Sequence, residues 1–92
     1  MKVVELRRRR PEDGAVQRLL RVYVREPGQP AEFDLLAPER ADGMRSLLAE
    51  GIPDGHGRQL HLSDGDQFLA ALVQAYNGSR YWAQVVEENE EG

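Results

Sequence analysis

The stretch KVVELRRRRPEDGAVQRLLRVYVRE, residues 2–26, decides the fold. Two runs that alternate polar and apolar residues, 3–10 and 16–26, flank the turn-forming residues 11–14, a pattern typical of a β-hairpin. If Arg10 lies opposite Val16, the apolar side chains collect on one face, whereas a slip of one residue would mix leucine and arginine on both. This register pairs Leu6 with Leu20, Val4 with Val22 and Lys2 with Val24.

The opposite face of the predicted hairpin is basic. It would hold Glu5 across from Arg21 and Val3 across from Tyr23, with Arg7, Arg9, Leu19 and Arg25 beside them. Strand alternation divides the run of four arginines, because Arg7 and Arg9 point one way and Arg8 and Arg10 the other.

The rest of the chain predicts five further elements. They are a strand over 31–36, a helix over 38–50 that stops at Gly51-Ile52-Pro53, a strand over 58–62, a helix from Ser63 to Asn77-Gly78, and a strand over 79–86. The order β-β-β-α-β-α-β indicates an α+β domain, residues 1–86, with an N-terminal antiparallel meander in a mixed sheet and two helices on one face. The last strand-helix-strand unit suggests a parallel crossover. Residues 87–92 form an acidic tail that we expect to be flexible.

Composition narrows the functional classes. The chain has 92 residues and no cysteine, which excludes disulfides, thiolate metal sites and a cysteine nucleophile. No stretch has the continuous apolar run of a signal peptide or a membrane span. We therefore expect a soluble cytoplasmic protein without membrane partners, with a bacterial source as the default. The preference for arginine over lysine suggests GC-rich coding or a hot habitat.

Charge is divided along the chain. The net charge is −4, but the first 26 residues hold eight basic and four acidic side chains, and residues 27–92 hold four basic and twelve acidic ones. A basic N-terminal segment joined to an acidic remainder produces a surface field that steers association with partners. We expect a non-enzymatic interaction domain that binds a protein partner, or a second copy of itself, through one basic and aromatic sheet face. The predicted contact residues are Arg7, Arg9, Arg21, Tyr23, Arg25 and Trp82.

Trp82 belongs to this set on geometric grounds. Tyr81 and Trp82 are adjacent in a predicted strand, so their rings point to opposite faces, and an outer ring beside Tyr23 and arginine would resemble a binding hot spot. The alternative function is a nucleic-acid-binding or regulatory domain that uses the same arginines on phosphates.

An enzyme is the weakest of the three hypotheses. His61, Asp64 and Asp66 are the one cluster of histidine and carboxylate residues, but their spacing matches no strong metal motif. Helix capping by Ser63 and the helix dipole account for Ser63, Asp64 and Asp66. We expect no catalytic residues, no metal and no cofactor.

Overall fold

The predicted hairpin is present in the computed structural model, which describes residues 1–88. β1 (Lys2–Arg9) and β2 (Val16–Val24) pair antiparallel, with Lys2 opposite Val24 and Leu6 opposite Leu20. The predicted register is therefore confirmed over the first half of β1.

A β-bulge changes the register beyond Leu6. Arg7 lies opposite Arg18, so Leu19 is an extra residue in β2, and Arg9 rather than Arg10 lies opposite Val16. Leu19, predicted for the outer face, is instead fully buried in the core. The extra residue allows both Leu19 and Leu20 to be buried, and it turns Arg18 to the outer face of the sheet.

The sheet is antiparallel throughout. β3 (Glu32–Leu35) lies beside β2, and β6 (Tyr81–Glu88) lies beside β1, which gives the order β3-β2-β1-β6. The α+β class and the three-stranded meander are confirmed, but the mixed sheet and the parallel crossover are wrong. The strand predicted over 58–62 is reduced to β5 (Gln59–Leu60), which pairs with β4 (Ile52–Pro53) in a separate two-stranded ribbon.

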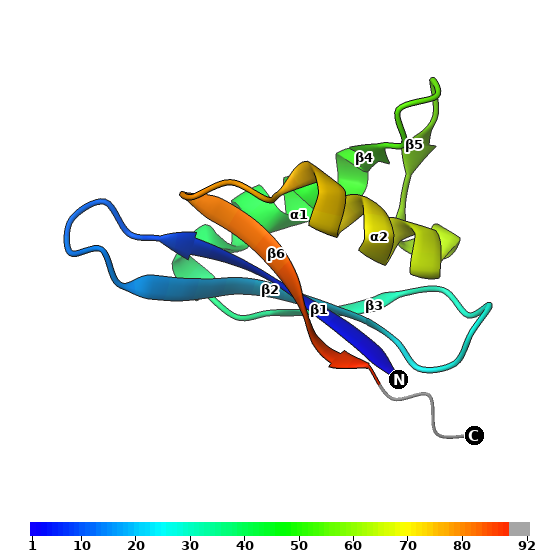
Figure 1. Cartoon of the computed structure of the whole chain (residues 1–92), viewed down its shortest axis with the longest axis horizontal. Helices are drawn as coiled ribbons and strands as arrows, with labels where there is room; N and C mark the ends of the chain where they lie inside the picture. The colour runs from blue at the N-terminus through cyan, green and yellow to red at the C-terminus, as the bar shows by residue number, and fades with distance from the viewer. Residues whose placement is uncertain (89–92) are drawn as a thin grey trace.

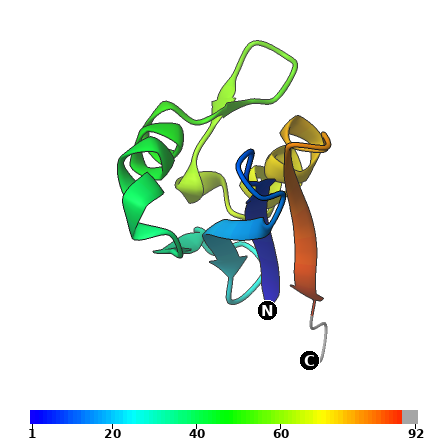
Figure 2. The same cartoon turned by 90° about the vertical axis from the view of Figure 1, so that its left-hand side faces the viewer.

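Two helices cover one face of the sheet, as predicted (Figures 1 and 2). α1 (Ala41–Glu50) follows a 3₁₀ turn at Pro38–Arg40 and ends at Gly51, whose φ is +82°. α2 (Asp66–Ala75) follows a second 3₁₀ turn, Leu62–Asp64. Ser63 does not cap this helix, because α2 begins only after Gly65, and no side chain caps its first turn.

The core lies between the sheet and the helices. Phe68, Leu69 and Leu72 of α2 are fully buried there, as the spacing of the apolar stripe predicts. They belong to one cluster with the inward side chains of the sheet, Val4, Leu6, Leu20, Val22 and Ala83. The opposite face of the sheet carries neither helix (Figure 1).

The last strand is longer than predicted at its C-terminal end. β6 continues through Glu88, two residues beyond the predicted strand, and residues 89–92 of the predicted tail lie outside the described residues. Across residues 1–88, no helix is long and apolar enough to cross a membrane.

Candidate functional site

The outer face of the sheet brings all six predicted contact residues together. Arg7 lies opposite Trp82 on β6, and Val3 lies opposite Tyr23 on β2. The bulge adds Arg18 to this surface. We call it the arginine face and define it by Glu5, Arg7, Arg9, Arg18, Arg21, Tyr23, Arg25 and Trp82.

One carboxylate organises the centre of the arginine face. Glu5 accepts hydrogen bonds from Arg7 at 3.1 and 2.9 Å, from Arg18 at 2.9 and 2.6 Å, and from Arg21 at 3.2 and 3.0 Å. Arg18 binds both carboxylate oxygens as a fork, the strongest geometry for this pair. Three guanidinium groups thus share the charge of Glu5, and Arg21 also pairs with Asp34 at 3.9 Å, which leaves one surplus positive charge in a fixed arrangement.

Burial makes this arrangement electrostatically strong. The Glu5 side chain is only 3% exposed, whereas those of Arg7, Arg21 and Arg18 are 24%, 35% and 51% exposed. The hydrogen bonds from Arg18, followed by those from Arg7 and Arg21, lower the pKa of Glu5 to about 2, against the opposing effect of burial. The carboxylate therefore stays ionised, and the guanidinium groups reach solvent around it.

The lowered pKa predicts a specific sensitivity to acid. The stabilisation by Glu5 is complete above its unfolded-state pKa of 4.5 and is lost as the pH falls towards the folded-state pKa of about 2. We expect the melting temperature of the wild type to fall more steeply across this window than that of Glu5→Gln. Thermal unfolding followed by circular dichroism measures both slopes. Glu26→Gln, at an exposed turn position, is the control, and equal slopes for Glu5→Gln and wild type would contradict the prediction.

Two cation–π contacts flank the carboxylate cluster. The guanidinium of Arg9 lies 5.6 Å from the centroid of the Trp82 ring, and that of Arg25 lies 5.5 Å from the Tyr23 ring. Arg25 also donates to Glu32 at 2.8 Å. Arginine stacked on tryptophan or tyrosine combines charge with a flat apolar surface, which is the composition typical of protein-binding hot spots.

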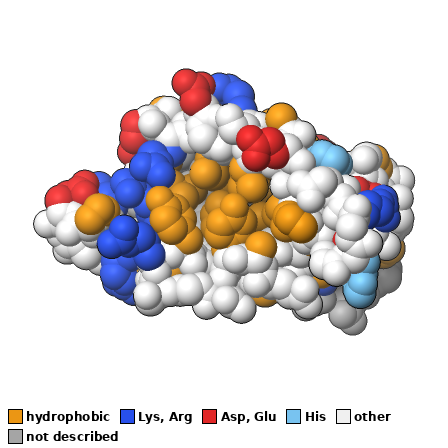
Figure 3. All heavy atoms as spheres, turned by 90° about the horizontal axis from the view of Figure 1, so that it is seen from above, with side chains coloured by type: hydrophobic (Ala, Val, Ile, Leu, Met, Phe, Trp, Pro, Cys, Tyr) orange, Lys and Arg blue, Asp and Glu red, His pale blue; other side chains and the backbone are white. Residues whose placement is uncertain are grey.

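The other arginines of the run lie outside the arginine face. Arg8 donates to Gln17 at 2.7 Å, and Arg10 forms an ion pair with Asp13 at 2.6 Å. A shallow hollow of about 340 Å³ near the β1–β2 turn is lined by Arg9, Arg10 and Arg80, together with Pro11, Gly14 and Ser79. Figure 3, seen from the helix side, shows Lys and Arg side chains gathered at this end of the molecule beside a band of hydrophobic side chains.

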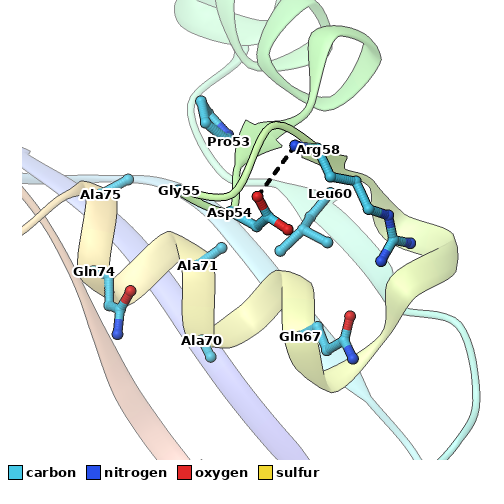
Figure 4. A pocket seen from close by; sticks show the side chains of 10 residues that line it. All are labelled: Pro53, Asp54, Gly55, Arg58, Leu60, Gln67, Ala70, Ala71, Gln74 and Ala75. Atoms are coloured by element: carbon cyan, nitrogen blue, oxygen red, sulfur yellow. Dashed lines mark hydrogen bonds between the residues drawn. The ribbon is translucent and has the colours of Figure 1, made fainter.

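A second hollow lies between α2 and the β4–β5 ribbon (Figure 4). It measures about 610 Å³ and has small side chains such as Ala71 and Ala75 on its α2 wall. Its charged groups already have partners, since Asp54 accepts the backbone N–H groups of His56 and Arg58 at 2.6 and 3.2 Å. The side chain of Arg58 is bound to Asp64 at 2.5 Å. These contacts hold the loop in place and do not favour a catalytic centre.

The histidine and carboxylate cluster has a structural role. Asp64 accepts the backbone N–H of His61 at 2.8 Å in addition to the Arg58 side chain. Within residues 1–88, no three His, Asp or Glu side chains are grouped as metal ligands. The arrangement therefore gives no support to a metal site at His61, Asp64 and Asp66.

Sequence reasoning missed Arg18 and the central role of Glu5. The signal for Arg18 was present, because Leu19 and Leu20 are adjacent apolar residues in a strand that otherwise alternates. An extra residue there allows Arg18 and Arg21, three positions apart, to share a face. Glu5 was expected opposite Arg21. That three arginines bind the Glu5 carboxylate together could not be inferred from the pairing of one strand with another.

Comparison with known proteins gave no match. No family model fits the chain, and no curated protein or solved structure is similar to it. The functional argument therefore depends on the arginine face itself.

Proposed function

We propose that this chain is a small, non-enzymatic interaction domain that binds an acidic protein surface through the arginine face. The observation that carries the proposal is the Glu5 cluster, in which one buried carboxylate fixes Arg7, Arg18 and Arg21 by six hydrogen bonds. Fixed guanidinium groups lose less conformational entropy when they bind a carboxylate than free ones do. The surface is thus organised for binding before a partner arrives.

The aromatic contacts support the same proposal. Trp82 and Tyr23 are half-buried, and each lies beneath an exposed arginine. A partner that covers them would bury ring surface and guanidinium together, which adds apolar contact to charge attraction. Such a surface favours an acidic protein or peptide that also offers apolar contacts over a ligand that is bound by charge attraction alone.

A polyglutamate peptide of about 12 residues tests the proposal. We expect backbone amide shifts in NMR titrations at low salt to appear on β1, β2 and β6, and to diminish at high salt. Arg9→Gln should weaken binding about fivefold, the effect of about 1 kcal/mol for one exposed charge pair. Arg45→Gln, on exposed α1, is the matched control and should leave binding unchanged. Shifts confined to other surfaces, or no shifts at low salt, would refute the proposal.

A nucleic-acid ligand is the second candidate. The hollow lined by Arg9, Arg10 and Arg80 supports it, because guanidinium groups around a concave surface suit phosphate oxygens. The test is a titration with short single- and double-stranded oligonucleotides at low salt. Affinity at least about tenfold above that for polyglutamate, with a loss in Arg80→Gln, would favour this candidate. Absence of binding at low salt would remove it.

A further inference from the structure

Two segments that are far apart in the sequence form a hollow at one end of the sheet. The β1–β2 turn and the connection between α2 and β6 lie at the same end of the molecule (Figure 1). The backbone N–H of Arg9 donates to the carbonyl oxygen of Arg80 at 2.9 Å and holds the two segments together. We call the space between them, about 340 Å³ in volume, the arginine hollow. Its lining consists of Arg9, Arg10, Pro11, Gly14, Ser79 and Arg80.

Two of the three arginines in the arginine hollow are fixed by contacts within the protein. Arg9 donates to the carbonyl oxygen of Gly14 at 3.1 Å, and its guanidinium lies over the Trp82 ring. Arg10 donates to both carboxylate oxygens of Asp13, at 3.3 and 2.6 Å. These contacts place two guanidinium groups before a ligand binds, which lowers the entropy that binding costs.

The third arginine leaves charge uncompensated. Arg80 is exposed, and within residues 1–88 its side chain has no hydrogen bond, ion pair or ring contact. Asp13 compensates the charge of Arg10, and none of the described residues that line the hollow is acidic. Glu12 of the same turn is exposed and lies outside the lining. The positive charges of Arg9 and Arg80 therefore remain on one concave surface.

We propose that the arginine hollow binds a phosphoryl dianion carried by a phosphorylated side chain of the acidic partner. This inference rests on the proposed function and names the group that the partner presents. A phosphorylated serine or threonine carries about −1.5 to −2 charges at pH 7 and three acceptor oxygens. That charge matches the two uncompensated cations, and the oxygens can accept hydrogen bonds from guanidinium groups on both walls of the hollow. A glutamate side chain supplies a single charge and compensates only half of this surplus.

The position of the hollow favours a protein as the source of the phosphoryl group. Arg9 belongs to both the hollow and the arginine face, so a segment that lies on the face extends directly into the hollow. Arg7 is two residues away along β1, or roughly 7 Å, and is level with an acidic residue two positions from the phosphorylated one in an extended segment. A nucleic acid would gain affinity by stacking bases on aromatic rings, but guanidinium groups already lie over the rings of Trp82 and Tyr23.

Three peptides that differ at one position test the inference. Each has a central serine, phosphoserine or glutamate, with about four glutamate residues on each side, which span roughly 13 Å when extended. Trp82 is the only tryptophan of the chain, and it lies beneath Arg9, so its fluorescence reports binding at the hollow. At low salt we expect the phosphoserine peptide to bind about tenfold more tightly than the glutamate peptide. In NMR titrations, the additional amide shifts should lie at the residues that line the hollow.

Arg80→Gln separates the phosphoryl contact from general charge attraction. The substitution removes an exposed side chain without a partner among the described residues, and circular dichroism checks that the variant folds. It should reduce the tenfold preference for phosphoserine to about threefold or less, while the affinity for the serine peptide changes by less than about twofold. Arg45→Gln removes the same charge from an exposed position on α1. This matched control should keep the preference of the wild type.

The alternative results contradict the inference in different ways. Equal affinity for the phosphoserine and glutamate peptides overturns it and leaves the proposed function intact. A preference for phosphoserine that survives in Arg80→Gln would place the phosphoryl group elsewhere. A 5′-phosphorylated oligonucleotide that binds more tightly than the phosphoserine peptide, and loses affinity in Arg80→Gln, would make the partner a nucleic acid. Inorganic phosphate that binds as tightly as the phosphoserine peptide would make this a site for the free ion. A chain that binds none of the three peptides overturns the proposed function as well.

Discussion

Glu5→Gln is expected to lower the free energy of unfolding by about 3 to 5 kcal/mol at neutral pH. The substitution keeps the size of the side chain but removes the one negative charge that Arg7, Arg18 and Arg21 share. Three guanidinium groups then lie close together around a buried amide that cannot accept all six hydrogen bonds. Urea unfolding followed by circular dichroism measures the loss.

A double substitution separates charge repulsion from a general defect in folding. Removing one of the three guanidinium groups in Glu5→Gln/Arg18→Ala should recover part of the lost stability, because fewer like charges remain together. Glu26→Gln removes a carboxylate from an exposed turn and should change stability by less than about 0.5 kcal/mol. A loss below about 1 kcal/mol for Glu5→Gln would mean that the cluster does not organise the face.

Gly65→Ala is expected to lower the free energy of unfolding by about 3 kcal/mol or more. Gly65 precedes α2 with φ +58° and ψ −122°, a conformation that side chains with a Cβ atom rarely adopt. A Cβ atom there would also collide with the carbonyl oxygen of Gln29 in the β2–β3 connection. Since Ala31 donates to the Leu62 carbonyl at 2.7 Å nearby, a shift would disturb the junction between the sheet and α2. Chemical denaturation measures the cost.

Gly43→Ala provides the matched control for this backbone effect. Gly43 lies within α1, has no positive φ, and would place its Cβ atom in open space. The same substitution should therefore stabilise the protein, by about 0.5 to 1 kcal/mol, because alanine favours the helix. A similar sign and size for both variants would contradict the role assigned to Gly65.

Much of the fold could be predicted because its signals are local. The alternation in residues 2–6 and 20–24 determines which side chains face the core, and it gave the correct partner for Leu6. The apolar stripe of α2 follows in the same way from helical spacing. The N-terminus of α2 was predicted wrongly, because Ser63 has the residue type of a cap but lies in a 3₁₀ turn that ends at Gly65.

The strand neighbours of the C-terminal half could not be predicted. Local alternation identifies a strand near Tyr81, but it does not say which edge of the sheet this strand joins or in which direction. The structure places it antiparallel to β1, with Trp82 beside Arg7. That single neighbour relation decides whether the aromatic ring joins the arginines, and it depends on contacts between residues about 75 positions apart in the chain.

The sequence by itself determined the hairpin, its apolar and basic faces, and the pairing of Glu5 with Arg21, since these follow from a period of two and a turn between the strands. Only the tertiary structure decided the bulge at Leu19, the position of β6 beside β1 and the convergence of three arginines on Glu5. The physical reason is that burial of Leu19 under the helices and the satisfaction of a buried carboxylate are properties of the whole packed sheet. Neither can be evaluated one strand at a time.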